Sequence, residues 1–322
     1  MCWCALLVSC TQSLPQDPET LFEQSIKSSR DEQTIRVIEV DKDEVIYLEQ
    51  EDREQALNKV QYIYPPAAIS LNKLNLKTRE KTLIQDLTQR KEVYLDSFEF
   101  KDEKYTVVAD TKNLNKKLYK NWLKDDEQLI TEINGHIHVF NSVMIVDESL
   151  YYIRHSRTNE MFELIHYDLE KEQENVIFTS KTYFYRIGDT VLYDSTKQKL
   201  LKLKDGVINE VAVNQKLTSG IETEDSIYLL GDDQNTYRFI FETQELIPVV
   251  NQSKIRMENK LKIDDESYLG INDQSQLVQF SFDGNKVNEI KVLQEGEVID
   301  IQLFEDNLVI TKTDKISLSS IK

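Results

Sequence analysis

The chain has 322 residues, of which 40% are apolar and 9% aromatic, and this composition excludes an intrinsically disordered protein. Its formal net charge of -18 argues against nucleic-acid binding, because phosphate contacts need a basic face, and equally against adsorption to anionic lipid headgroups. A chain of about 300 residues is long for one compact core unless that core is built from repeats.

The first recognisable element is a short N-terminal motif that ends in a cysteine. Leu7-Val8-Ser9-Cys10 follows an apolar run from Trp3 and precedes a polar, proline-containing stretch that ends at Pro18. This motif resembles the lipobox of bacterial lipoproteins, whose cysteine is lipidated before the signal segment ahead of it is removed. The resemblance implies a signal segment over residues 1–9, a lipid anchor and tether over 10–31, and a folded domain over 32–322.

Lipidation of Cys10 would hold the protein on the extracytoplasmic face of a bacterial cell membrane. Cys2, Cys4 and Cys10 are the only cysteines, so cleavage before Cys10 would leave the folded body without a disulfide. No Lys or Arg precedes Cys10, and we therefore expect the natural start codon to lie upstream. The alternative is that Cys4 to Val8 forms an ordinary buried strand. No other apolar run approaches the roughly 18 residues that a membrane-spanning helix needs.

The next segment, Glu19 to Ser29, predicts a helix, because Leu21, Phe22 and Ile26 would share one side of it. Beyond it, a pattern recurs seven times: an acid, one residue of any type, and then two or more apolar or β-prone residues. The leading acids are Glu44, Glu103, Glu148, Asp189, Asp225, Glu266 and Asp306. They stand 59, 45, 41, 36, 41 and 40 residues apart, and the last five spacings lie near the period of a four-stranded propeller blade.

Each copy of the pattern lies among alternating stretches that predict four antiparallel strands. Around the third copy these are Val143–Val146, Tyr151–Ile153, Phe162–Tyr167 and Asn175–Phe178. We assign the acid to the tight turn between the first two strands, where its side chain can accept a backbone hydrogen bond.

The repeat resembles that of the seven-bladed β-propeller superfamily, and more loosely the TolB-like propeller domains of bacterial envelope proteins. The resemblance implies an all-β fold of about seven four-stranded antiparallel blades, with six or eight as alternatives, and it implies no particular activity. The sequence does not determine which segment completes the last blade and closes the ring. The last repeat ends at Lys322 after its third strand, and the candidate donor of a fourth, Thr34–Val40, also belongs to the first blade.

Residues 51–66 form an insertion between the second and third strands of the first blade. It contains Tyr62, Tyr64, Pro65 and Pro66, which form a candidate exposed contact patch for a binding partner.

Two histidines, His136 and His138, are weak candidates for a metal site. They flank one residue in a predicted strand, so their imidazoles would point the same way. A surface pair after the Asn134-Gly135 turn is the favoured interpretation, and we expect neither a metal nor a cofactor.

The sequence lacks the common catalytic motifs, among them the Gly-x-Ser-x-Gly elbow, the Walker loop and the His-Glu-x-x-His zinc motif. The leading hypothesis is a non-enzymatic, membrane-anchored binding or scaffolding propeller with a protein partner in the cell envelope. The rival is an envelope enzyme, a lyase or hydrolase, in which His, Arg and carboxylates with perturbed pKa values converge at one mouth of the channel. A weaker third hypothesis is a sensor or immunity-type lipoprotein that acts through the insertion.

Overall fold

The structure of the chain is a computed structural model that describes residues 19–23, 35–50, 67–110, 115–133, 143–146, 149–156, 158–264, 267–312 and 315–320. These residues form 28 β-strands and no helix, which confirms the predicted all-β class. Accordingly, no segment within these ranges is a helix long and apolar enough to cross a membrane.

Consecutive strands pair with one another, so that the chain folds into successive antiparallel groups of four strands. The first three groups are β2 (Ile35–Asp41), β3 (Glu44–Gln50), β4 (Ala68–Asn75) and β5 (Lys81–Asp86); β6 (Glu92–Phe100), β7 (Glu103–Asp110), β8 (Lys116–Lys120) and β9 (Gln128–Ile133); and β10 (Val143–Val146), β11 (Ser149–Ser156), β12 (Met161–Asp168) and β13 (Gln173–Ser180). The next three are β14 (Phe184–Arg186), β15 (Val191–Asp194), β16 (Lys199–Lys204) and β17 (Val207–Ala212); β18 (Leu217–Glu222), β19 (Ser226–Gly231), β20 (Thr236–Ile240) and β21 (Glu245–Asn251); and β22 (Arg256–Lys262), β23 (Ser267–Ile271), β24 (Leu277–Asp283) and β25 (Lys286–Gln294). The last group joins β26 (Val298–Phe304), β27 (Asn307–Lys312) and β28 (Lys315–Ser320) to β1 (Glu19–Glu23).

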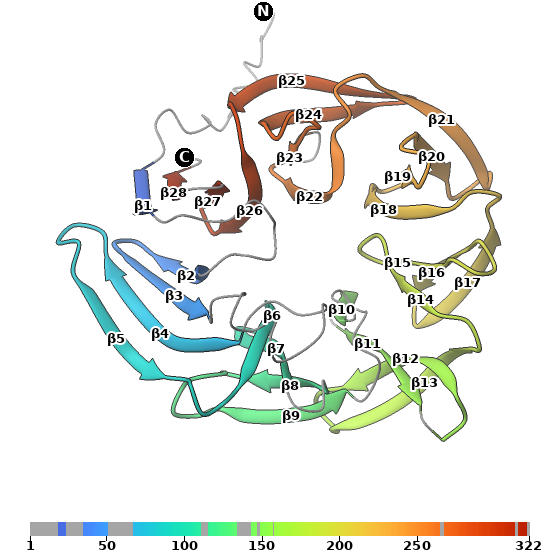
Figure 1. Ribbon diagram of the computed structural model, residues 1–322. Coiled ribbons are helices and arrows are strands. Elements are labelled where there is room, and N and C mark those ends of the chain that lie inside the picture. The colour runs from blue at the N-terminus through green and yellow to red at the C-terminus, as the bar shows by residue number, and fades with distance from the viewer. Residues whose placement is uncertain are drawn as a thin grey trace, which may run out of the picture.

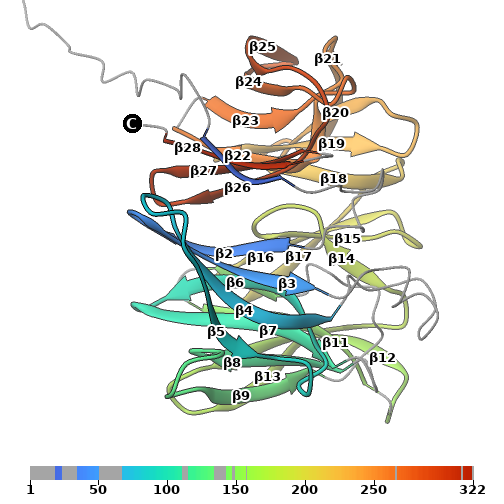
Figure 2. The same ribbon diagram turned by 60° about the vertical axis from the view of Figure 1, so that its left-hand side comes forward.

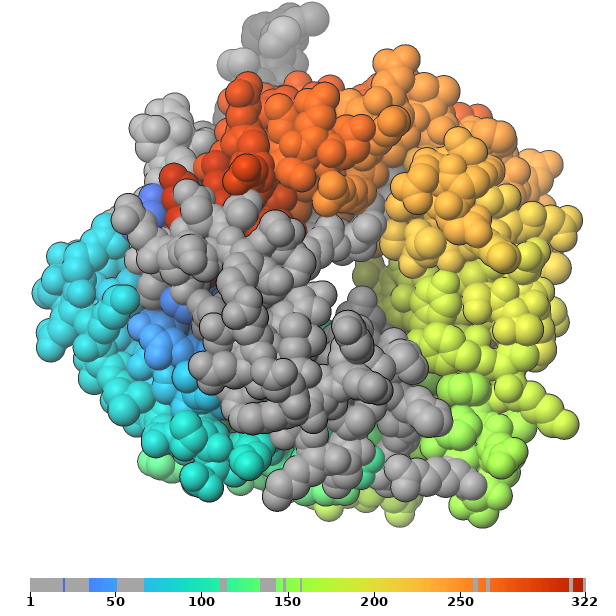
Figure 3. Space-filling view, in the orientation of Figure 1, coloured from blue at the N-terminus to red at the C-terminus, as the bar shows by residue number. Residues whose placement is uncertain are grey.

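The groups stand side by side around a central axis, as the ring in Figure 1 shows. The first strand of each group lies nearest the centre and the fourth strand lies at the rim, so each sheet radiates outward. The rotated view in Figure 2 shows the same sheets packed face against face. An opening is visible near the centre of the ring in Figure 3. This arrangement is that of a β-propeller.

The number of blades depends on how two neighbouring groups are counted. Strand β21 pairs with β25 in parallel, with Val250 opposite Lys286 and Asn251 opposite Val287. By hydrogen bonding, this contact fuses β18–β21 and β22–β25 into one sheet of eight strands, whereas by connectivity they are two groups of four. The predicted count of seven blades therefore stays a prediction.

Ring closure differs from a sequence-based expectation for the N-terminal region. Glu19–Glu23 is strand β1 and not the start of a helix, and it pairs antiparallel with β28, with Glu19 opposite Leu318 and Glu23 opposite Lys315. Of the two assignments left open for Thr34–Val40, the first blade is the one found, because Ile35–Asp41 forms β2, the inner strand of the first group, and does not complete the last one. Strand β28 otherwise presents an unpaired edge, and satisfying those backbone groups outweighs the weak local helical pattern of the segment.

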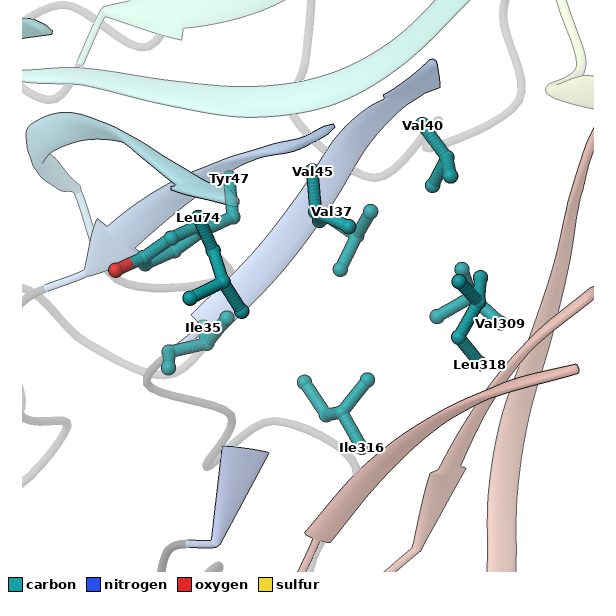
Figure 4. Close-up of a cluster of buried hydrophobic side chains, with 9 residues drawn as sticks. All are labelled: Ile35, Val37, Val40, Val45, Tyr47, Leu74, Val309, Ile316 and Leu318. Atoms are coloured by element: carbon teal, nitrogen blue, oxygen red, sulfur yellow. The ribbon is translucent and has the colours of Figure 1, made fainter. Parts of the chain in front are cut away.

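Apolar clusters fill the spaces between neighbouring sheets. At the junction between the first and last groups, Ile35, Val37, Val40, Val45, Tyr47 and Leu74 meet Val309, Ile316 and Leu318, and we call these nine residues the closing cluster. In Figure 4 the side chains from the two groups point toward one another. Similar clusters join each of the following groups to the next. The alternating apolar residues of the sequence therefore serve contacts between sheets.

Three of the leading acids of the repeat make an ion pair with the third strand of their own group. Glu44 pairs with Lys73 at 3.0 Å, and Glu103 pairs with Lys120 at 2.9 Å, in each case across to the third strand of the same group. In the fifth group, Asp225 pairs with an arginine of the third strand at 2.9 Å. In these three groups the acid thus ties the second strand, or the turn before it, to the third strand through an ion pair of opposite charges.

Candidate functional site

The candidate site residues from the sequence lie outside the described residues. These are Cys10, the patch Tyr62, Tyr64, Pro65 and Pro66, and the pair His136 and His138. The described ends of the insertion, Gln50 on β3 and Ala67 before β4, do show that it leaves the first group between its second and third strands, as predicted. The lipid anchor, the contact patch and the weak metal site stay predictions.

The described chain offers a different candidate site, which is the charged lining of the central channel. The inner strands β2, β6, β14 and β26 carry Arg36, Asp96, Arg186 and Asp300, respectively. These residues are far apart in sequence, and the ring brings their strands together around the axis (Figure 1). We refer to these four residues as the channel lining.

Arg36 joins three groups of strands at the channel. Its Nη1 donates to Asp300 Oδ2 at 3.2 Å, which ties β2 to β26 beside the closing cluster. With the amide of Gln302 turned so that its oxygen faces the guanidinium, that oxygen accepts from Nε at 3.1 Å and from Nη2 at 2.7 Å. The guanidinium also lies 5.9 Å from the ring centroid of Tyr94 on β6, within the range of a cation–π contact. All three nitrogens of the guanidinium are therefore engaged within the protein.

Asp96 faces the same space, and its carboxylate is electrostatically the most unusual group of the lining. Desolvation by the surrounding protein raises the pKa of Asp96, while a hydrogen bond from the Ser97 amide and the charges of Arg36 and Arg186 act in the opposite direction. The amide bond measures 2.9 Å, and the Ser97 hydroxyl shares a 2.7 Å hydrogen bond with the Tyr94 phenol. Water still reaches the exposed carboxylate, which limits this rise.

Arg186 is held mainly by backbone acceptors. Its Nε donates to the carbonyl of Gly188 at 2.9 Å, and its Nη1 donates to the carbonyl of Val143 on the neighbouring group at 3.2 Å. Its Nη2 reaches the exposed carboxylate of Asp189 at 3.4 Å. Two backbone carbonyls and one exposed carboxylate thus hold the guanidinium in place.

The described residues of the lining do not form a nucleophile with a base. The Ser97 hydroxyl bonds to a phenol, and His155 and His166 lie on the middle strands β11 and β12. There His155 contacts the ring of Phe162 at 4.8 Å between centroids, and His166 contacts a tyrosine at 5.0 Å. Across the described ranges, no three His, Cys, Asp or Glu side chains are grouped as a metal site would require. The lining can therefore bind polar or charged groups.

Sequence reasoning missed all four residues of the channel lining. Arg36 stands between Ile35 and Val37 in a strand that is mainly apolar, and Arg186 follows three aromatic residues. A charged residue inside the first strand of a blade is the signal that would have found them, because that strand lies nearest the channel.

Comparisons with known proteins give the fold and not a family. No protein-family model matches the sequence, and no curated protein matches it either. Among solved structures, a chain from the crystal structure of a mitotic checkpoint complex is 8% identical, with a TM-score of 0.55 and with 100% of both chains covered. PorZ, an essential bacterial surface component of the type-IX secretion system of Porphyromonas gingivalis, is 10% identical with a TM-score of 0.53; the match covers 90% of this chain and 38% of PorZ. These likenesses fit a β-propeller.

Proposed function

We propose that this chain is a β-propeller that binds a protein partner without catalysing a reaction, held by a lipid on Cys10 at the outer face of a bacterial cell membrane. The observation that carries the binding role is the channel lining, in which charged side chains from four groups are fixed in place by partners within the protein. Such a preorganised polar surface loses little freedom when it binds. Two proteins that share the fold, a component of a checkpoint complex and a bacterial surface component, support this choice.

The membrane anchor is tested by comparing two cysteine variants. Cys10→Ala removes the lipidation site and should move the protein from the membrane fraction to the soluble fraction. Cys4→Ala is the matched control, because signal cleavage would remove this residue and membrane retention should not change. Retention of Cys10→Ala in membranes would refute lipidation.

The partner is tested by pull-down of the intact protein from detergent-solubilised membranes. Wild-type protein should recover a specific partner, and a double variant that replaces Arg36 and Arg186 by Gln should recover less of it. Recovery of a monodisperse monomer alone, at native expression levels, would contradict the binding role.

One observation favours the alternative of an envelope enzyme, a lyase or hydrolase. Asp96 has a raised pKa and faces two arginines, as a general acid beside an anionic substrate would. The predicted histidine is missing from the described part of the lining, which weakens this alternative. Turnover of envelope polysaccharide or peptide substrates that disappears in Asp96→Asn would establish it.

A further inference from the structure

A cavity of about 280 Å³ lies between the groups β18–β21 and β22–β25, and it shares no residue with the channel lining. Three connections border it: the β19–β20 turn with Gln234, the β21–β22 connection with Lys254, and the β23–β24 turn with Asp273. Because alternate turns of a meander lie at opposite ends of its strands, all three lie at the same end of the ring. The volume is close to the lower limit of about 300 Å³ for ligand pockets, so it suits a small ligand.

The wall of this cavity is rigidly built around Asn251. Its amide nitrogen donates to Thr236 Oγ1 at 3.1 Å and to the carbonyl of Ile255 at 3.3 Å. Its amide oxygen accepts from the backbone nitrogen of Ile255 at 3.1 Å. These bonds fix the β21–β22 connection against β20, and they place Arg256, the first residue of β22, beside the cavity.

The charges around the cavity do not balance. Lys254 lies 3.7 Å from Asp273, so these two side chains neutralise one another. Arg256 is half-buried, and among the described residues it makes no ion pair and no side-chain hydrogen bond. The side chains that line the cavity therefore carry one net positive charge, in a protein whose net charge is -18. Two acids, Asp232 and Asp233, lie on the bordering β19–β20 turn, and Asp233 accepts hydrogen bonds from Asn235 and Tyr237. General attraction of anions to such a protein is unfavourable, so an anion needs a local cation to bind.

We propose that this cavity binds a small organic oxyanion, either a carboxylate or a phosphate ester, with Arg256 as the anion-binding residue. A guanidinium matches the two oxygens of such a group with parallel hydrogen bonds. Leu230, Val249 and Ile255 supply apolar surface for a carbon body, which favours an organic anion over a bare inorganic one. The site depends neither on the lipid anchor nor on a protein partner, so it extends the proposed function and does not rest on it.

The test is calorimetric titration of the full-length chain at constant ionic strength with succinate, glycerol 3-phosphate and neutral glycerol. At least one of the two anions should bind saturably, and glycerol should not. Binding of succinate alone assigns a carboxylate ligand, and binding of glycerol 3-phosphate alone assigns a phosphate ester. Arg256→Gln should weaken the affinity by about tenfold or more, because it removes a charged hydrogen-bond donor.

Two variants make the result specific to the cavity. Arg79→Gln removes the same charge from an exposed position and should leave the affinity within about twofold of wild type. Arg256→Lys keeps the positive charge but lacks the paired donors of the guanidinium, so it should bind with an intermediate affinity. This variant also tests the proposal if Arg256→Gln does not fold. The proposal is overturned if Arg256→Gln binds as tightly as wild type, if Arg79→Gln loses affinity equally, or if neither anion binds saturably below about 10 mM. None of these outcomes bears on membrane release of Cys10→Ala.

Discussion

The closing cluster makes a quantitative prediction about what holds the ring together. Ile316 on β28 is 1% exposed and lies in the cluster with Ile35 and Val37 of β2 (Figure 4). Ile316→Ala deletes three buried carbon atoms, which at about 0.8 kcal/mol each amounts to roughly 2.4 kcal/mol of lost burial. The space left between two sheets that are each tied into the ring cannot fully collapse, so the cavity adds to this loss. We expect a total decrease of about 3–4 kcal/mol in the free energy of unfolding.

The assay is urea denaturation followed by far-UV circular dichroism, with Ile290→Ala as the matched control. Ile290 lies on the rim strand β25 and is 55% exposed, so the same chemical deletion should cost less than about 1 kcal/mol there. The slope of the free energy with urea should stay the same in both variants, which would show that the native and unfolded states are otherwise unchanged. If the two variants lose equal stability, the closing cluster does not join the first and last groups as described.

Three further predictions concern a buried carboxylate, a buried amine and the closing strand. Glu92 is buried and accepts hydrogen bonds from Arg90 Nε at 2.8 Å, Trp122 Nε1 at 3.1 Å and the Tyr119 hydroxyl at 3.1 Å, so Glu92→Gln should cost about 3 kcal/mol in urea denaturation. Glu170→Gln, whose side chain is 80% exposed, should cost less than about 0.5 kcal/mol, and an equal loss in both variants would contradict the role of Glu92. Burial lowers the pKa of Lys116 from 10.5 to about 7. Between these two pH values the amine is protonated in the unfolded state and neutral in the folded state. The free energy of unfolding should therefore rise with pH by up to about 1.4 kcal/mol per pH unit. Lys116→Met should flatten this rise between about pH 7.5 and 9.5 and exposed Lys77→Met should not; an unchanged slope in Lys116→Met would show that another group causes it. Deletion of residues 1–23 should leave the edge of β28 unpaired and cause concentration-dependent association in light scattering, and a stable monomer would indicate that β1 is dispensable.

The sequence predicted the body of the fold well, because each sheet is formed by neighbouring segments. Val143–Val146 was expected as a first strand and is β10, while Phe162–Tyr167 and Asn175–Phe178 lie within β12 and β13. In these segments alternation of apolar residues and short turns agree with one another, so local information is enough. The same information failed at Glu19–Glu23, where the partner strand lies at the other end of the chain.

The candidate sites are formed by contacts between residues that are distant in sequence. For this reason the sequence patterns predicted other residues as sites. Arg36 contacts Asp300, which is 264 residues away in the sequence, and no local sequence pattern predicts that pair. Arg256 is recognisable only because it has no ion-pair partner among the described residues, which is a property of the folded neighbourhood. Both arginines nevertheless occupy the first strand of a four-strand group, where the backbone faces the centre or the next group. The repeat shows which strand of each group comes first. A charged residue within such a strand then marks a position of interest, because its charge is either neutralised by partners within the ring, as for Arg36, or available to a ligand, as we propose for Arg256.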